Sequence, residues 1–300
     1  MLTNRQELTK MHFINAKKIL SAQNGMNIYR GCTHGCIYCD AQSDCYHMQH
    51  SFTDVAVKQN APILLRTELM KKRKKCMIGT GSMSDPYMHC EERMRLTRQC
   101  AEIINELHFG LAVQTKSDRI LCDADLLQSI NSQAKCVVQT TLTTFGEDLC
   151  KIIEPNVCST KARYYMLKEM QRRNIPTIVW LSPVLPFIND TEENLRGLLD
   201  YCFDAGVKGI ICFGFGTTMR AGSREPFYAA LDKHFPQLKQ RYIDTFGYAY
   251  NCPSPNHHKL MRILVEQCDK YGIIHDADRI FAYLRDLPER NKQISIFDEN

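Results

Sequence analysis

The chain has 300 residues and a formal net charge of +5, and 44% of its residues are hydrophobic and 24% charged. This length and balance supply a core for one large domain or two ordinary globular domains. The small charge does not by itself indicate a nucleic-acid-binding protein, and no run approaches the ~18 apolar residues of a membrane span. The first twenty residues carry charges throughout and have no apolar segment typical of a secretion signal.

The chain contains fifteen cysteines, a number that would suggest disulfides in a small secreted protein. Twelve of them are scattered singly through predicted helices and strands, which is the distribution expected of reduced, buried thiols. We therefore expect a cytoplasmic, reducing environment, which would suit an oxygen-sensitive metal cluster.

Residues 1–26 are predicted to form a lead-in that covers one end of the core. They include an amphipathic stretch, Ala16–Ala22, and then Asn24-Gly25 as a turn signal. A short strand is expected over Asn27–Arg30, and it leads directly into a cysteine-rich loop.

That loop, Tyr29–Ser43, places Cys32, Cys36 and Cys39 in a CxxxCxxC spacing. Three thiols so spaced let one tight loop wrap a small inorganic core, and the glycines at 31 and 35 leave room for the backbone to approach it. A [4Fe-4S] cluster has four irons, so three local cysteines leave one iron without a local protein ligand.

The spacing alone also permits a zinc site or three unrelated buried thiols. A zinc ion would need a fourth ligand nearby, and His34, Cys45 or His47 could supply it. The cysteine loop by itself does not decide between these alternatives.

A basic run, Lys71–Lys75, ends the helix predicted over Pro62–Lys74. Basic residues are favoured at the C-terminus of a helix, so the run is typical of a solvated helix end. The alternative is contact with nucleic-acid phosphates, which would make binding salt-dependent without giving sequence specificity.

From Lys75 onward a unit of apolar strand, polar loop and helix recurs. Counting the strand before the cysteine loop, the strand candidates are Asn27–Arg30, Cys76–Gly79, Leu111–Gln114, Cys136–Gln139, Thr177–Leu181 and Gly209–Phe213. The helices expected between and after them are Glu91–Leu107, Asp123–Asn131, Glu147–Ile153, Ala162–Arg173, Thr191–Ala205 and Phe227–Phe235. Continuous apolar strands joined by such crossovers predict a parallel sheet.

Two parallel architectures compete for this pattern. A doubly wound sheet would be expected to carry a glycine-rich phosphate loop, and no GxGxxG follows the first strand. In a barrel, the loops after all strands meet at one face, and the active site lies there. The polar, glycine- and cysteine-bearing loops here follow strands, so we predict an α/β fold with a partial (β/α)6 TIM-like barrel over residues 27–240.

Residues 241–300 are predicted to form a C-terminal extension packed on the same domain. Its first part, Phe246–Asn256, is aromatic and proline-rich, and helices are expected over Lys259–Tyr271 and Ala277–Leu284. An open barrel has a gap at its side and mouth. We expect the extension to close that gap and exclude water.

The cysteine loop, with Tyr38 directly before its last cysteine, resembles the radical S-adenosylmethionine (SAM) enzymes. The resemblance implies that the open iron binds the amino and carboxylate groups of SAM, and that an electron from the cluster splits the sulfonium. The product is a 5′-deoxyadenosyl radical that abstracts hydrogen from a substrate. The family's six-stranded open (β/α)6 barrel agrees with the strand count.

Several strand-end loops are similar to those of the spore photoproduct lyase-like branch of this family, and the similarity extends over residues 27–272. They are Ser82–Pro86, Thr115–Ser117, Glu154-Pro155 followed by Arg163, and Pro183–Pro186 ahead of Asn189-Asp190.

Five residues are carried over from this resemblance as SAM contacts. Ser84 would contact the amino-acid part, Lys116 the carboxylate or the ribose hydroxyls, and Thr141 of the Thr140-Thr141 pair the ribose. Arg163 would act as a carboxylate clamp, and Tyr38 would pack near the adenine or the cluster. Such polar partners at the mouth of a barrel suit the charged ends and hydroxyls of SAM.

Four of these five residues also have an ordinary structural interpretation. Ser84 and Asp85 could cap the following helix, and Lys116 and Arg163 could be solvated. Tyr38 could be a buried core residue.

One position departs from the lyase. Where the lyase has its hydrogen-donating cysteine, this chain has Ser82, and a hydroxyl is a poor hydrogen-atom donor to a carbon radical. Reversal of thymine dimers is therefore doubtful. Cys90 or Cys252 could donate from other positions, although both are also expected as small buried hydrophobic residues.

We thus predict a radical SAM enzyme that binds one [4Fe-4S] cluster and SAM, takes electrons from a donor such as flavodoxin or ferredoxin, and acts on an unidentified substrate. Its catalytic residues are not predicted. The alternatives are a nucleic-acid repair or modification enzyme of the photoproduct-lyase type and a non-catalytic iron–sulfur or zinc-binding protein.

Overall fold

A computed structural model describes residues 10–288 of the chain. Residues 1–9 of the predicted lead-in and residues 289–300 of the predicted extension lie outside the described residues. Within the described part, no helix is long and apolar enough to pass through a membrane.

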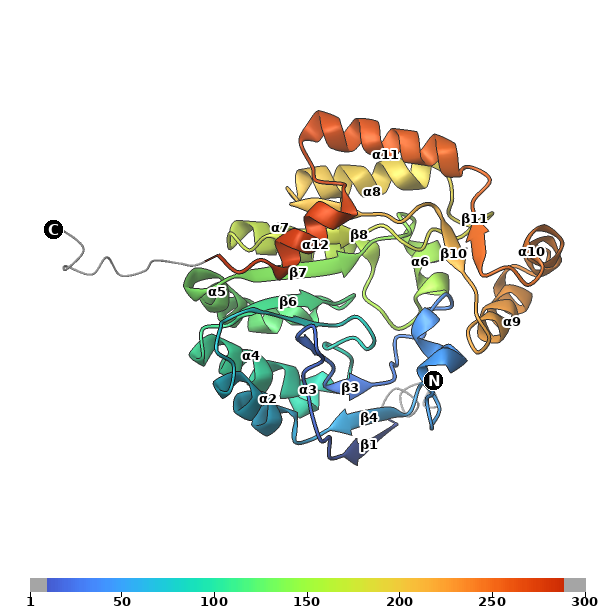
Figure 1. Ribbon diagram of the computed structural model, residues 1–300. Helices are drawn as coiled ribbons and strands as arrows, with labels where there is room; N and C mark the ends of the chain where they lie inside the picture. Colours follow the sequence, from blue (N-terminus) through green and yellow to red (C-terminus); the bar gives the residue numbers. More distant parts are fainter. Residues whose placement is uncertain (1–9, 289–300) are drawn as a thin grey trace.

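The centre of the fold is a six-stranded sheet in which every neighbouring pair of strands is parallel (Figure 1). Its order in space follows the chain: β2 (Gly25–Met26), β5 (Met77–Thr80), β6 (Gly110–Gln114), β7 (Cys136–Thr141), β8 (Thr177–Trp180) and β9 (Gly209–Ile211). Among the described residues β2 and β9 do not pair with each other, so the sheet is open. The predicted parallel partial barrel is confirmed.

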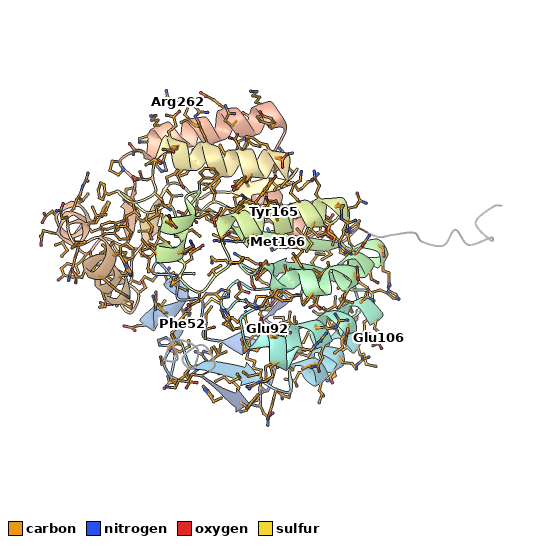
Figure 2. The ribbon with its side chains drawn as sticks, turned by 180° about the vertical axis from the view of Figure 1, so that it is seen from behind. Phe52, Glu92, Glu106, Tyr165, Met166 and Arg262 are labelled. Carbon is orange, nitrogen blue, oxygen red and sulfur yellow. The ribbon has the colours of Figure 1, made fainter. Side chains whose placement is uncertain are left out.

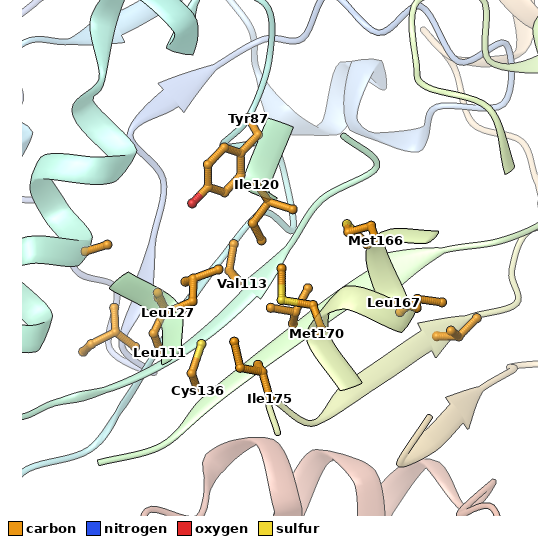
Figure 3. Close-up of a cluster of buried hydrophobic side chains, with 14 of the residues drawn as sticks. Tyr87, Leu111, Val113, Ile120, Leu127, Cys136, Met166, Leu167, Met170 and Ile175 are labelled. Atoms are coloured by element: carbon orange, nitrogen blue, oxygen red, sulfur yellow. The ribbon is translucent and has the colours of Figure 1, made fainter. Parts of the chain in front are cut away.

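Helices cover the outer face of the sheet. They are α2 (Ala61–Met70), α3 (Glu91–Met94), α4 (Leu96–Glu106), α5 (Ala124–Gln133), α7 (Thr160–Arg172), α8 (Glu192–Asp204) and α11 (His257–Tyr271). Figure 3 shows part of the resulting core, where Leu111 and Val113 of β6 and Cys136 of β7 meet Leu127 of α5 and Met170 of α7. Burial on this face explains why alternate strand residues are large and apolar.

The inner face of the sheet is covered by α12 (Ala277–Arg285), which lies in front of β7 and β8 in Figure 1. Ile280 and Leu284 of this helix join an apolar cluster with the inner-face residues Met77, Ala112, Val137, Ile178 and Ile211. Towards the carboxyl ends of the strands the inner face becomes polar, with Gln114, Gln139 and Thr141. The helix therefore fills one end of the barrel and leaves the other end open.

The carboxyl ends of the strands point towards a group of elements on the right of Figure 1. Two short strands, β10 (Gly216–Thr218) and β11 (Asn251–Pro253), form an antiparallel pair there. Beside them lie α6 (Glu147–Ile153), α9 (Arg224–His234) and α10 (Leu238–Phe246), around a third apolar cluster that includes Leu185, Phe227 and Tyr242. The predicted aromatic segment Phe246–Asn256 thus supplies β11 at the mouth of the barrel.

The first predicted strand is displaced. Gly25–Met26, and not Asn27–Arg30, pairs with β5, whereas β3 (Tyr29–Arg30) enters a separate sheet of order β1-β4-β3. Its other strands are β1 (Met11–Ile14) and β4 (Val55–Lys58). The sequence did not predict this sheet, because its short strands pair over about 25–45 residues and carry little periodicity.

The helix predicted over Glu91–Leu107 is interrupted at Arg95, whose φ of 50° is left-handed. The result is the two helices α3 and α4. The amphipathic stretch Ala16–Ala22 is not helical. Its Ile19 and Leu20 are buried, and their backbone N–H groups donate to the Glu68 carboxylate at 2.8 and 3.1 Å.

Because α12 packs inside the barrel, truncating a buried residue of this helix should lower the stability of the fold strongly. Ile280 is fully buried, so Ile280→Ala should lower the free energy of unfolding by about 2–5 kcal/mol, because it leaves a cavity against β9. Arg279→Ala, at an exposed position of the same helix, should change it by less than about 0.5 kcal/mol. Urea denaturation measures both, and equal effects would contradict the packing.

Candidate functional site

The cysteine loop is fixed on one side by the segment before β4. The Cys32 N–H donates to the Phe52 carbonyl at 2.9 Å. Gly31 precedes it with φ +97°, and a Cβ there would lie 2.6 Å from the same carbonyl oxygen. Glycine is required because the backbone approaches so closely in a conformation that other residues avoid.

On its other side the loop is held by the segment after α6. The Asn156 side chain donates to the Thr33 carbonyl at 2.9 Å, and the Asn156 backbone N–H donates to the His34 carbonyl at 3.1 Å. The Ile37 N–H donates to the Ile153 carbonyl at 3.0 Å. The loop is thus positioned by hydrogen bonds from two segments distant in sequence.

Cys32, Cys36 and Cys39 all line one hollow of about 80 Å³. Burial raises the pKa of Cys32 to about 12 and raises the pKa of Cys36 and Cys39 above the usual thiol range. A dry site therefore keeps these thiols protonated until a positively charged metal group binds. The metal then replaces the thiol protons and balances the charge of the thiolates. This donor set, three thiols around a small hollow, fits an iron–sulfur cluster.

The same thiols do not fit a single zinc ion. Sulfur ligands of tetrahedral zinc lie about 3.8 Å apart, because each Zn–S bond is ~2.3 Å. In the described part of the chain, the three Sγ atoms do not form a group whose ligand atoms all lie within 4.8 Å of one another. None of His34, Cys45 and His47 completes such a group with them.

Asp85, in the loop after β5, connects the neighbouring strand-end loops. Its carboxylate accepts hydrogen bonds from the Thr115 hydroxyl at 2.6 Å, the Lys116 N–H at 2.7 Å and the Tyr87 N–H at 2.8 Å. It also lies 3.5 Å from Nδ1 of His34 in the cysteine loop. The interpretation of Ser84 and Asp85 as caps of the following helix is wrong, because α3 begins only at Glu91 and has no side-chain cap. The sequence alone did not indicate Asp85 as a site residue, because its partners Thr115 and Lys116 lie about thirty residues away.

Ser84 and His34 present polar atoms without partners to the same hollow. Both side chains are buried and line it, and no described residue bonds to the Ser84 hydroxyl or to Nε2 of His34. Burial lowers the pKa of His34 to about 4, so the ring is neutral at pH 7. Buried polar atoms without a partner cost free energy, so this arrangement fits a polar ligand in the hollow.

Lys116 and Thr141 line both the small hollow and a larger cavity beside it. Burial would lower the pKa of Lys116, but the negative charges of Cys36, when it is a thiolate, and of Glu154 outweigh this effect and raise that pKa. The ammonium group therefore stays charged inside the site. Such a cation suits a carboxylate ligand.

Arg163 lies behind this wall and does not line either hollow. Its fully buried guanidinium pairs with the Glu154 carboxylate and donates to the Thr141 carbonyl at 2.7 Å. Glu154 in turn accepts a hydrogen bond from the Tyr38 hydroxyl, and its pKa is lowered because Arg163 and Lys116 outweigh the effect of burial. The predicted SAM contacts of Arg163 and Tyr38 stay predictions, and the structure gives both residues the same buried partner.

The larger cavity has a volume of about 800 Å³ and occupies the open end of the barrel. Trp180, Phe213 and Phe215 contribute aromatic lining, and residues of β10 and β11 form part of its wall. The two hollows share lining residues: Cys39, Ala41, Ser82, Met83, Gln114, Lys116 and Thr141. The larger cavity is therefore directly adjacent to the cysteine hollow.

Beside this cavity, Arg220 and its neighbours join the cysteine loop to the β10–β11 pair. Arg220, just after β10, donates to the Tyr250 hydroxyl at 2.7 Å and to Cys45 Sγ at 3.2 Å. Its Nε lies 3.5 Å from the Asp40 carboxylate. The Asp44 N–H donates to the Ala221 carbonyl at 3.0 Å, which adds a backbone contact to the same junction.

The thiols considered as hydrogen-atom donors are buried in apolar clusters. Cys90 belongs to the main core, and Cys252 belongs to the cluster around Phe227 and Tyr242, with its thiol 3.7 Å from the Ala249 carbonyl. Cys252 also contributes to the lining of the larger cavity, whereas Ser82 lines both hollows. A donor role for either cysteine stays a prediction.

The basic run Lys71–Lys75 follows α2 and precedes β5, so it lies at the amino ends of the strands, away from the cavity. Lys72 donates to the Asn24 side chain at 2.6 Å, and Lys75 lies over the Phe109 ring at 4.4 Å. Contact of this run with phosphates stays a prediction that the position of the cavity does not favour.

Residues 26–202, more than half of the chain, match the family model of the radical SAM superfamily. The chain belongs to the radical SAM superfamily. It is a radical SAM enzyme, and membership implies a [4Fe-4S] cluster and SAM as cofactors. The cysteine hollow and its unpartnered polar atoms fit that pair.

Relatives extend over most of the radical SAM chain. An uncharacterised protein of Methanocaldococcus jannaschii is 33% identical over 181 residues, which covers 60% of this chain and 67% of that protein. An uncharacterised protein of Mycobacterium tuberculosis is 26% identical over 243 residues, which covers 79% of this chain and 71% of that protein.

Solved structures of spore photoproduct lyase have a similar fold. One variant of that lyase aligns with a TM-score of 0.59 at 12% identity, over 89% of this chain and 81% of the lyase. Another variant, with bound AdoMet and dinucleoside spore photoproduct, aligns with a TM-score of 0.55 at 11% identity, over 89% of this chain and 80% of the lyase. At this level of identity the likeness concerns the fold alone.

Because Glu154 and Arg163 form a buried pair, replacing one of them should lower the free energy of unfolding much more than replacing both. Arg163→Ala should lower the free energy of unfolding by about 3–5 kcal/mol, because it leaves the Glu154 carboxylate buried without its counter-charge. The combination Glu154→Gln with Arg163→Met should recover most of that loss.

Arg196→Ala, which removes an exposed pair with Glu192, is the matched control and should cost less than about 1 kcal/mol. Chemical denaturation measures all three variants. A cost for Arg163→Ala no larger than that of the control would contradict the structural role of the pair.

Proposed function

We propose that the chain cleaves SAM reductively at the cysteine hollow and uses the resulting radical to abstract hydrogen from a substrate held in the larger cavity. The observation that carries this proposal is the shared wall of the two hollows. Because the same side chains line both hollows, a ligand bound beside the cysteines lies next to the space available to a substrate.

When bound, the cluster and SAM would supply the initial electron and the 5′-deoxyadenosyl radical. Cys32, Cys36 and Cys39 would hold the cluster. Lys116 would bind the SAM carboxylate or ribose hydroxyls, Ser84 its amino-acid part and Thr141 its ribose, as the resemblance implies. The unpartnered Ser84 hydroxyl and the buried charge of Lys116 support these assignments.

The chain's own residues would also keep water from the reacting centre. Helix α12 fills the end of the barrel opposite the cavity, and Arg220 links the cysteine loop to the β10–β11 pair beside the cavity. An enclosed site limits side reactions of a reactive intermediate. Asp85 would hold the loops after β5 and β6 in fixed positions around the reacting centre.

Radical SAM enzymes need a reductant, and we propose a flavodoxin or ferredoxin in that role. We also propose a cytoplasmic, reducing location. All fifteen cysteines are free thiols, which supports such a location because disulfides persist mainly in oxidising compartments.

Anaerobic reconstitution with iron and sulfide tests the cluster assignment. The wild-type chain should bind about four irons and release 5′-deoxyadenosine when dithionite and SAM are added. Cys36→Ala should lose both properties, since it removes one of the three ligands.

Cys45→Ala, at an exposed cysteine close in sequence, should retain both iron and SAM cleavage. Tight zinc binding with no SAM cleavage by the wild type would falsify the enzyme assignment. Loss of iron from both variants alike would refute the choice of ligands.

The role of Lys116 predicts a defect in SAM binding without a defect in iron content. Lys116→Gln should weaken SAM binding about 10–100-fold, because a hydrogen bond to a charged group contributes about 1.5–3 kcal/mol. Equilibrium dialysis with the iron-loaded protein measures the affinity. Lys151→Gln, at an exposed lysine, should leave it unchanged, and an unchanged affinity for Lys116→Gln would contradict the assignment.

A further inference from the structure

A second cluster of ligand-type side chains lies behind the cysteine loop, outside the cavity. One nitrogen each from His12 and His50 and one carboxylate oxygen of Asp54 lie within 4.8 Å of one another. No other group of three or more His, Cys, Asp or Glu residues between 10 and 288 meets this distance. The three residues come from β1 and from the segment that leads into β4, so the three-stranded sheet brings them together.

One distance in the cluster matches the separation of two ligands of the same metal ion. Nδ1 of His12 lies 3.2 Å from the Asp54 carboxylate oxygen. Nitrogen and oxygen ligands on bonds of ~2.0–2.1 Å lie about 3.3 Å apart in a tetrahedral zinc site. The rings of His12 and His50 meet edge to face, with centroids 4.7 Å apart.

A backbone contact fixes which nitrogen of His50 carries the hydrogen. Its Nδ1 lies 3.0 Å from the Ser51 carbonyl oxygen, and a carbonyl oxygen only accepts, so Nδ1 carries the hydrogen. Nε2 is then the nitrogen with a free lone pair. Histidine ligands are held in this way by a hydrogen bond from the other ring nitrogen to a carbonyl or carboxylate.

Charge and access also suit a cation. Two imidazoles and one carboxylate form a ligand set that suits a divalent cation and leaves a position open for water. The side chains of His12 and Asp54 are 38% and 23% exposed, so an ion can reach them from solvent.

We propose that His12, His50 and Asp54 form a binding site for a divalent transition-metal ion, with Zn²⁺ as the best-fitting ion. The site is separate from the cysteine hollow, and its ligands are nitrogen and oxygen atoms, whereas the cluster ligands are sulfur. The proposal does not depend on SAM chemistry.

An ion at this site would stabilise the segment on which the cysteine loop rests. His50 and Asp54 flank Phe52, which is labelled in Figure 2, and the Phe52 carbonyl accepts the Cys32 N–H. The Asp54 N–H donates to the Ser51 carbonyl at 3.0 Å and closes the same turn. Zinc bound here would thus hold the backbone partner of the first cysteine in place.

Metal content of the full chain tests the proposal. The protein is reconstituted with iron and sulfide, so that the three cysteines are occupied, then given Zn²⁺ and dialysed. Elemental analysis should find about one zinc per wild-type chain in addition to the iron, whereas His50→Gln and Asp54→Asn should lose the zinc and keep the iron.

His47→Asn is the matched control. His47 is an exposed histidine of the same segment with φ 50°, a conformation that asparagine tolerates, and this variant should retain the zinc. Equal zinc in the wild type and in both ligand variants would overturn the proposal, as would no zinc in the wild type.

Thermal unfolding gives a second measurement that does not need retained metal. At a hundredfold excess of Zn²⁺ over its dissociation constant, the midpoint of the wild type should rise by about 5 °C. The midpoints of His50→Gln and Asp54→Asn should not move. A rise of the same size in these variants would show that zinc acts elsewhere and would refute the site.

Discussion

The buried ion pair between Glu154 and Arg163 is the interaction on which the site depends most. Three parts of the site meet at it: Tyr38 of the cysteine loop, the Thr141 carbonyl at the end of β7, and the charge of Lys116. Buried charges are tolerated only when they are paired and hydrogen-bonded, so the pair fixes the relative position of these parts. The Lys116 ammonium can remain charged in a dry wall because this carboxylate lies near it.

The barrel divides its inner face between two tasks. Near the amino ends of the strands, α12 fills the interior with apolar side chains, and near the carboxyl ends the strand residues are polar and face the cavity. Chemistry at the carboxyl ends is general for parallel α/β barrels, because the loops after the strands converge there. The helix supplies the floor that an open six-stranded sheet lacks.

Local features of the sequence predicted much of this arrangement. The spacing of Cys32, Cys36 and Cys39 and the polar loops after apolar strands depend on neighbours in the chain, so they could be interpreted without a structure. The contacts of Asp85, the position of α12 inside the barrel and the convergence of His12 with Asp54 depend on residues 30 or more positions apart. Burial of Arg163 was not predictable for the same reason, since an arginine in a helix is usually solvated.

The junction around Arg220 differs from the buried contacts of the barrel in its exposure to solvent. Its ion pair with Asp40 and its bond to Tyr250 involve partly exposed side chains, and such contacts typically contribute less than about 1 kcal/mol each. The apolar cluster around α12 and the Glu154–Arg163 pair are buried away from water, so salt affects them little. Ionic strength can therefore loosen the contact between the cysteine loop and the β10–β11 pair while the buried core keeps its stability.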